Sequence, residues 1–168
     1  IENLALIDIG ASKMNINIIS KGMSVVARDI VVGSRQLTER IMGQFDLEFE
    51  EAEALKLVVD PAGDKANELD EIFSSVCTQW ILEIKKAIDL YHSNFPDAPL
   101  TRLVLSGGGS KVAGLTDYLN QETGIEVERF NPFTNMKSSK RKIDPEYLQL
   151  IGPEMAIASG IAIRPSAI

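Results

Sequence analysis

The chain has 168 residues with a formal net charge of −7; 45% of its residues are hydrophobic and 24% are charged. This composition is that of one folded domain with a sizeable core, and it excludes a disordered chain. The acidic balance argues against a nucleic-acid partner, because phosphate backbones are bound mainly by Lys and Arg. The single cysteine, Cys77, excludes an internal disulfide, which suits a reducing compartment, and the single histidine, His92, excludes a two-histidine metal motif.

Three short strands are predicted in the N-terminal part of the chain. Residues 4–9 form an apolar run, residues 14–19 alternate between apolar and polar side chains, and residues 25–32 are rich in β-branched side chains. The turns between these strands, at residues 9–12 and 21–22, are short and contain glycine. Loops of this length connect antiparallel neighbours, so we expect the three strands to form a meander.

Helical spacing replaces the strand pattern after Gly33. Apolar residues recur at helical intervals from Leu37 to Met42, and Ser34 is suited to cap the start of that helix. Residues 49–56 predict a second, short helix whose first turn is acidic, where the helix dipole favours negative charge.

The clearest helix is predicted at residues 65–91, after a break at residues 60–64. Its apolar residues fall on one stripe with a period of about 3.6, which indicates packing on a core rather than a cofactor site. Cys77 lies on that stripe and is interpreted as a packing residue. His92 lies near the end of the helix and is disfavoured as a catalytic base.

The rest of the chain predicts strands separated by helices. Strands are expected at residues 101–105 and 125–129, with a helix at 113–122 between them, and a final helical region at 145–163 is interrupted by Gly152–Pro153. Because the meander is followed by strands that are joined through helices, we expect an α/β domain with one mixed sheet.

The first candidate motif is Leu6-Ile7-Asp8-Ile9-Gly10-Ala11-Ser12, a buried strand that ends in an aspartate and a glycine turn. Such a turn can present backbone N–H groups and the hydroxyl of Ser12 to phosphate oxygens, while Asp8 orients hydrated Mg²⁺. The alternative is an ordinary hairpin whose turn is stabilised by side chains. The motif alone leaves both interpretations open.

The second candidate motif is Leu103-Val104-Leu105-Ser106-Gly107-Gly108-Gly109-Ser110-Lys111, a strand followed by three glycines and the approach to a helix. A dinucleotide fingerprint requires glycine where Val112 stands, and a P-loop requires Lys before Ser, so neither common phosphate loop is present. What remains is a shelf of three glycines at the end of a strand, on which a flat group could rest without meeting a Cβ atom. A tight turn without any ligand is the alternative.

Together with the small-residue helix Ala156-Ile157-Ala158-Ser159-Gly160, these motifs resemble the second half of the actin, heat-shock chaperone and sugar-kinase superfamily. Within it, the chain is similar to the family of the type IV pilus assembly protein PilM, a relative of the cell-division protein FtsA. The similarity rests on five blocks that occur in the family's order. These blocks are residues 5–11 with 15–17, 28–41, 49–56, 105–110 and 131–133.

The resemblance implies an actin-like (ribonuclease H-like) ATPase domain of the α/β class, with a mixed five-stranded sheet whose β-meander is flanked by helices. It further implies that residues 1–168 are a single actin-like subdomain, the second half of the ATPase fold, with a helical insertion at about residues 45–95. The N-terminal half, which carries the family's first phosphate loop, would then be absent. We therefore expect weak nucleotide binding by this chain alone.

Carried over to this sequence, the resemblance implies a site for the phosphates of ATP and for Mg²⁺. Asp8 would hold Mg²⁺ through water, and Gly10, Ala11 and Ser12 would surround the β- and γ-phosphates. Gly33 belongs to a turn that the family often builds as Gly-Gly, and it is counted among the phosphate-binding residues.

The resemblance also implies contacts to the nucleoside. Glu53 and Lys56, one helical turn apart, would reach the ribose or the adenine edge. The alternative for this pair is an ordinary exposed ion pair. Gly107, Gly108 and Gly109 would carry the nucleoside itself.

The function implied by the resemblance is that of a nucleotide-binding, actin-like scaffold of the type IV pilus machinery rather than an enzyme, cytoplasmic and peripheral to the inner membrane. Its expected partners are the cytoplasmic N-terminal tail of the inner-membrane protein PilN, mostly through the missing half, and other pilus assembly proteins. Two alternatives stay open: a polymerising cytoskeletal protein like FtsA, and a kinase or phosphatase of the same fold. The basic cluster at residues 136–142 is either a solvated loop or a contact for acidic lipids or an acidic partner.

Overall fold

The structure, a computed structural model, describes residues 2–58, 63–134 and 143–164, so the basic cluster at residues 136–142 lies outside the described residues. The helices and strands follow the predicted order. They are β1 (Leu4–Ile9), β2 (Met14–Ser20), β3 (Met23–Ile30), α1 (Arg35–Phe45), α2 (Phe49–Lys56), α3 (Ala66–Asn94), β4 (Arg102–Ser106), the 3₁₀ turn η1 (Gly108–Lys111), α4 (Leu115–Thr123), β5 (Glu126–Arg129), α5 (Pro145–Ile151), the 3₁₀ turn η2 (Gly152–Met155) and α6 (Ala156–Ala162).

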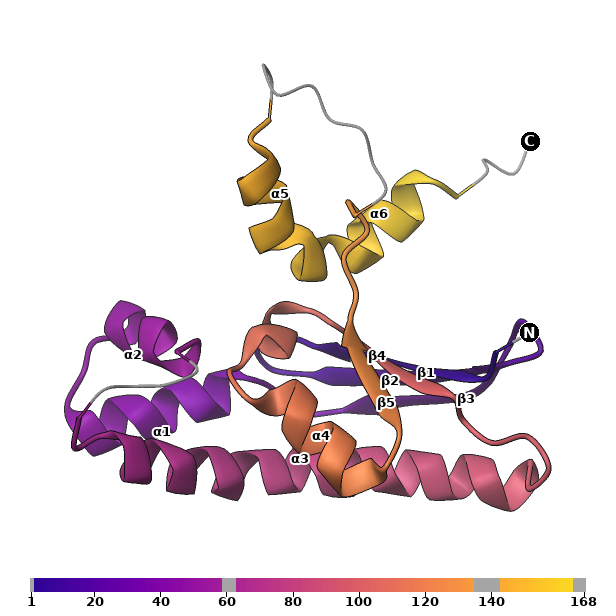
Figure 1. Cartoon of the computed structure of the whole chain (residues 1–168), viewed down its shortest axis with the longest axis horizontal. Helices are drawn as coiled ribbons and strands as arrows, with labels where there is room; N and C mark the ends of the chain where they lie inside the picture. The colour runs from indigo at the N-terminus through magenta and orange to yellow at the C-terminus, as the bar shows by residue number, and fades with distance from the viewer. Residues whose placement is uncertain (1, 59–62, 135–142, 165–168) are drawn as a thin grey trace.

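The described strands form one five-stranded sheet in the order β3-β2-β1-β4-β5. The first three strands pair antiparallel, as the predicted meander requires, whereas β4 runs parallel to both β1 and β5. Figure 1 shows α3 passing along one face of this sheet, with α1 and α2 beyond the ends of the strands. The predicted α/β class with a mixed sheet is confirmed.

The core lies between the sheet and α3. Alternate residues of β1 point into it, since Ala5, Ile7 and Ile9 are all fully buried. The apolar stripe of α3 packs on the same face, with Trp80 and Ile84 at its centre, both without exposed surface. Burying a large apolar side chain contributes about 1.5–3 kcal/mol, so this layer is a major source of the stability of the domain.

Several element ends differ by a few residues from the sequence prediction, and two of these differences bear on the candidate motifs. The strand predicted to reach residue 32 ends at Ile30, because Val31 leaves the sheet and is 83% exposed. The helix predicted from residue 113 begins at Leu115, since η1 precedes it and Gly114 adopts a φ of +74° at the helix start. Both differences fall at the end of the sheet where the candidate motifs lie.

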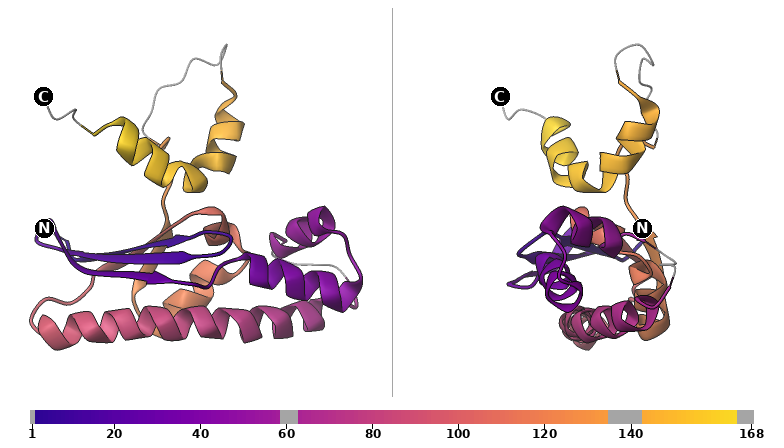
Figure 2. Two further views of the ribbon diagram at one scale, coloured as in Figure 1. Left: turned by 180° about the vertical axis from the view of Figure 1, so that it is seen from behind. Right: turned by 90° about the vertical axis from the view of Figure 1, so that its left-hand side faces the viewer.

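The C-terminal segment α5–η2–α6 stands on the side of the sheet opposite to α3 (Figure 2). Neither α5 nor α6, both described in full, buries a residue, whereas η2 buries Gly152 and Pro153. Across the described ranges, no helix is both long and apolar enough to cross a membrane.

Candidate functional site

A cavity of about 460 Å³ opens where β1 and β4 end, and we call it the strand-end cavity. Its walls come from segments that are distant in the sequence: the β1–β2 turn, the start of α1, α2, the glycine turn and the C-terminal segment. It is lined by Asp8, Gly10, Ala11, Ser34, Arg35, Phe49, Glu53, Lys56, Leu57, Gly107, Gly108, Lys111, Glu154 and Ile157.

The floor of the strand-end cavity is set by the parallel register of β1 and β4, which places Asp8 directly beside Ser106. The Ser106 hydroxyl donates a hydrogen bond of 2.7 Å to Oδ2 of Asp8, so the carboxylate is held in one orientation. The two candidate motifs therefore lie side by side at one edge of the sheet, as a shared site requires. This edge is also where ligands bind in open α/β sheets.

The β1–β2 turn is tied to the start of α1 through its carbonyl groups. The backbone N–H groups of Ser34 and Arg35 donate to the carbonyls of Gly10 and Ala11, each at 2.9 Å. A Cβ atom on Gly33 would lie 2.3 Å from the Ala11 oxygen, so glycine is required there by packing. Ser34 stands at the predicted cap position of α1, but its side chain makes no capping hydrogen bond.

Two of the predicted phosphate-binding residues in this region do not line the strand-end cavity. Ser12 and Gly33 instead line a second, smaller cavity of about 280 Å³. Gly10 and Ala11 line the strand-end cavity as expected, and Ala11 borders both cavities.

The three consecutive glycines have different roles. Gly107 has a φ of +81°, and a Cβ atom there would lie 2.4 Å from the backbone oxygen of Ile9; a Cβ atom on Gly109 would lie 2.4 Å from Cγ2 of the same isoleucine. Both are therefore glycine because the turn packs on the end of β1. Of the three, only Gly108 could carry a Cβ atom without a clash, since the nearest atoms outside the turn are Cγ and Cδ of Glu154 at 3.9 and 4.0 Å, so it alone resembles the predicted shelf. Gly107 and Gly108 line the strand-end cavity, whereas Gly109 does not.

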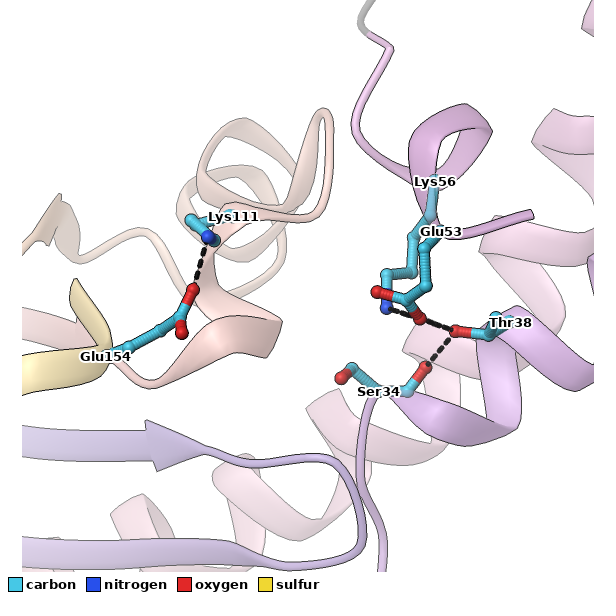
Figure 3. Close-up of polar contacts among 6 residues, drawn as sticks. All are labelled: Ser34, Thr38, Glu53, Lys56, Lys111 and Glu154. Carbon is cyan, nitrogen blue, oxygen red and sulfur yellow. Dashed lines mark hydrogen bonds and ion pairs between the residues drawn. The ribbon is translucent and has the colours of Figure 1, made fainter. Parts of the chain in front are cut away.

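Helix α2 presents one face to the strand-end cavity, with Phe49, Glu53 and Leu57 at helical spacing. Lys56 lies beside them, and its side chain is only 4% exposed. Its ammonium group donates to Oε1 of Glu53 at 2.5 Å and to the Thr38 hydroxyl at 3.0 Å, and that hydroxyl donates in turn to Glu53 (Figure 3). The alternative of an ordinary exposed ion pair is therefore wrong for Lys56.

Electrostatics favour the charged form of Glu53. Burial raises the pKa of its carboxyl group, but the hydrogen bonds from Lys56 and Thr38 and the positive charges of Lys56 and Lys111 outweigh that effect. The net result is a pKa below the ordinary value. Glu53 is thus a fixed acceptor at neutral pH, suited to hydroxyl groups.

The wall opposite α2 contains residues that sequence reasoning missed. Lys111 of η1 forms an ion pair with Glu154 of η2, and Figure 3 shows this pair facing the Glu53–Lys56 pair. Phe49 could have been found from its helical spacing to Glu53, and Lys111 from its closeness to the glycines. Glu154 carried no local signal, because its position depends on how the C-terminal segment folds back.

Asp8 is the carboxylate at the floor of the strand-end cavity that a hydrated cation could use. Within the described residues, no group of three or more His, Cys, Asp or Glu side chains could hold a metal ion. Magnesium commonly keeps several waters and uses one or two carboxylates plus phosphate oxygens, which Asp8 at the cavity floor can satisfy. Arg35, Lys56 and Lys111 line the same space, and both lysines are paired there with carboxylates, Lys56 with Glu53 and Lys111 with Glu154.

The lone cysteine and histidine have no part in this site. Cys77 is fully buried on α3, where burial raises the pKa of its thiol to about 12, so its predicted packing role is confirmed. His92 lies in the last turn of α3 and does not line the strand-end cavity.

Comparisons with known proteins agree with this fold. The family model described as type IV pilus assembly protein PilM matches residues 2–166. The solved PilM–PilN type IV pilus biogenesis complex matches with a TM-score of 0.80 at 24% identity, over 98% of this chain and 47% of that chain.

Two further solved structures are similar at lower identity. MreB 5 of Spiroplasma citri bound to AMPPNP has a TM-score of 0.60 at 13% identity, over 96% of this chain and 55% of that chain. Ta0583, an archaeal actin homolog in complex with ADP, has a TM-score of 0.59 at 17% identity, over 96% of this chain and 50% of that chain. These identities show the fold alone, which is actin-like, and the chain spans about half the length of the structures it matches.

Proposed function

The chain belongs to the family of the type IV pilus assembly protein PilM, and from this premise we propose that it contributes one half of a nucleotide site in an actin-like scaffold of the type IV pilus machinery. The nucleotide would be ATP with Mg²⁺. Two of the similar structures carry AMPPNP or ADP by their descriptions, which supports the nucleotide class. Because the chain spans about half of those structures, the other wall of the cleft would come from residues beyond this chain.

The observation that carries this proposal is the alignment of Asp8 with Ser106 across two parallel strands. It brings an Asp-Gly turn and a glycine turn to one edge of a sheet, where backbone N–H groups and a carboxylate can serve one ligand. Asp8, oriented by Ser106, would accept hydrogen bonds from the waters around Mg²⁺. Bound Mg²⁺ would neutralise phosphate charge.

The nucleoside would lie between α2 and the glycine turn. Glu53 is a charged acceptor suited to ribose hydroxyls, and Lys56 holds it in place. Gly108 offers bare backbone, and Phe49 and Leu57, about 40% exposed, offer apolar surface to a base. In this assignment Gly33 and Gly109 support the turns rather than touch the ligand.

The proposed single actin-like subdomain spans residues 1–168, and its proposed helical insertion at about residues 45–95 would include α2 and α3. A PilN-type inner-membrane protein is the proposed partner, since the similar solved structure is a PilM–PilN complex. The protein would then act on the cytoplasmic side of the inner membrane, attached through its partners and other pilus proteins.

Titration calorimetry with Mg-ATP on the full-length protein tests the proposed site. Asp8→Asn should weaken binding by about tenfold or more, because the oriented charge near Mg²⁺ is lost. Asp29→Asn is the matched control: this aspartate also lies on a sheet strand and contacts an asparagine, Asn15, but it does not line the strand-end cavity. No detectable binding by the unmodified protein, or equal binding by both variants, would contradict the proposal.

A further inference from the structure

Glu154 and Lys111 join the C-terminal segment to the glycine turn inside the strand-end cavity. Lys111 is mostly buried, with 19% of its side chain exposed, whereas Glu154 is 42% exposed. Nearby, the backbone N–H of Gly107 donates to the carbonyl of Pro153 at 2.8 Å. This backbone hydrogen bond holds η2 against the glycine turn and so positions the carboxylate of Glu154 beside Lys111.

The Glu154 side chain lies over Gly108, the one glycine of the three that could carry a Cβ atom without a clash. A Cβ atom on Gly108 would lie 3.9 Å from Cγ and 4.0 Å from Cδ of Glu154, and outside the turn itself no other heavy atom of the described residues would lie within 4 Å of it. The Glu154 side chain therefore covers the bare backbone that the proposed nucleoside would use. A ligand and this side chain cannot both occupy the surface of Gly108.

The charges in the strand-end cavity also set Glu154 against an anionic ligand. Lys56 is held by Glu53, and Lys111 is held by Glu154, so both lysines of the cavity are paired with carboxylates. An anionic ligand gains little from a lysine that is already neutralised, and it is repelled by the carboxylate beside it. Of the two carboxylates, Glu154 is the one that stands over Gly108 and lies on a separate segment.

We propose that Glu154 is a built-in competitor for nucleotide: it occupies Gly108 and neutralises Lys111 in the free protein, and it must turn away when nucleotide binds. This inference rests on the proposed function and concerns the regulation of the same site. Displacement of Glu154 releases the side-chain link between η1 and η2 but leaves the Gly107–Pro153 backbone bond. Nucleotide binding would thereby remove one of the contacts that hold the C-terminal segment on the glycine turn.

Calorimetry with Mg-ATP on the full-length protein tests this role, with Glu154→Gln as the main variant. Glutamine keeps the shape but removes the charge, so binding should become about threefold to fivefold tighter, the range of a partly exposed ion pair. Glu122→Gln is the matched control, because Glu122 forms a similar partly exposed pair with Lys85 at 2.8 Å, outside the strand-end cavity. That control should bind as the unmodified protein does.

A variant of Lys111 tests whether the result is specific to the Lys111–Glu154 pair. Lys111→Gln should weaken binding, and Glu154→Gln should bring a smaller gain in the Lys111→Gln background, because there it removes only the repulsion and frees no lysine. Unchanged or weaker binding by Glu154→Gln would overturn the inference while leaving the proposed function in place. Absence of Mg-ATP binding in every variant would instead be a failure of the proposed function, and the inference would fall with it.

A measurement without nucleotide tests the inference about Glu154 separately from the proposed function. Acylation of lysine amines, read by mass spectrometry, should proceed faster at Lys111 in Glu154→Gln than in the unmodified protein, while Lys85 reacts equally in both. Equal reactivity at Lys111 would mean that the ion pair does not hold it, which also overturns the inference.

Discussion

The long helix α3 and the C-terminal helices α5 and α6 use their apolar residues in opposite ways. Helix α3 runs for 29 residues and buries eight of them against the rest of the domain, including Trp80 and Ile84. Helices α5 and α6 bury none, and Ile161 of α6 remains 69% exposed. The stability of the domain therefore resides in the sheet and α3, while the C-terminal segment is held at η2.

The largest effect should come from Ile84→Ala in α3, and Ile161→Ala in α6 is its matched control. The first creates a cavity at a fully buried position and should lower the free energy of unfolding by about 2–5 kcal/mol. The second removes an exposed side chain and should change it by less than about 0.5 kcal/mol. Urea denaturation of this chain measures both. Similar losses in the two variants would mean that α6 is as well packed as α3.

The junction between these two regions gives an intermediate effect. Gly107→Ala requires a positive φ at a non-glycine residue and places a methyl group against the backbone of Ile9, so we expect a loss of about 2–4 kcal/mol. Gly108→Ala has ordinary contacts and should change the free energy of unfolding by less than about 0.5 kcal/mol. Thermal unfolding monitored by circular dichroism compares the two variants. Equal unfolding temperatures would show that the turn does not pack on β1 as described.

The smallest effect concerns Glu53 and depends on pH. Because its pKa is lowered in the folded chain, ionised Glu53 adds stability above the ordinary glutamate value of 4.5, and this contribution is lost as the pH falls through the lowered pKa. Glu53→Gln should therefore be less stable than the unmodified chain at pH 7, and the difference should vanish in acid. Urea unfolding at a series of pH values measures it. A difference that grows in acid would reverse the assigned sign.

Most of the fold could be predicted from the sequence because its signals are local. The alternation in residues 14–19 and the long stripe around Trp80 each follow from a few neighbouring residues, and both gave elements of the correct type. The element ends at Ile30 and Leu115 could not be placed. Both depend on contacts between the β1–β2 turn, the start of α1 and the glycine turn, which are distant in sequence.

The candidate site was predictable only in part for the same reason. Asp8 and Gly108 were found from motifs, whereas the packing roles of Gly33 and Gly109 became visible only with their neighbours in place. Residue spacing also suggested the Glu53–Lys56 pair but not the burial of Lys56, whose ammonium group contacts Thr38 of another helix. Glu154 could not be predicted at all, because it contacts Lys111 only through the folding of the C-terminal segment, 43 positions away in the sequence.

The bond between Ser106 and Asp8 joins residues 98 positions apart, and the Gly107–Pro153 bond adds a third segment to the same spot. During synthesis on a ribosome, the β1–β2 hairpin can form early, but the strand-end cavity has no opposite wall until Glu154 has emerged. Each of these two bonds closes a long loop, so the edge of the sheet that carries Asp8 should form later in folding than the β1–β2 hairpin does.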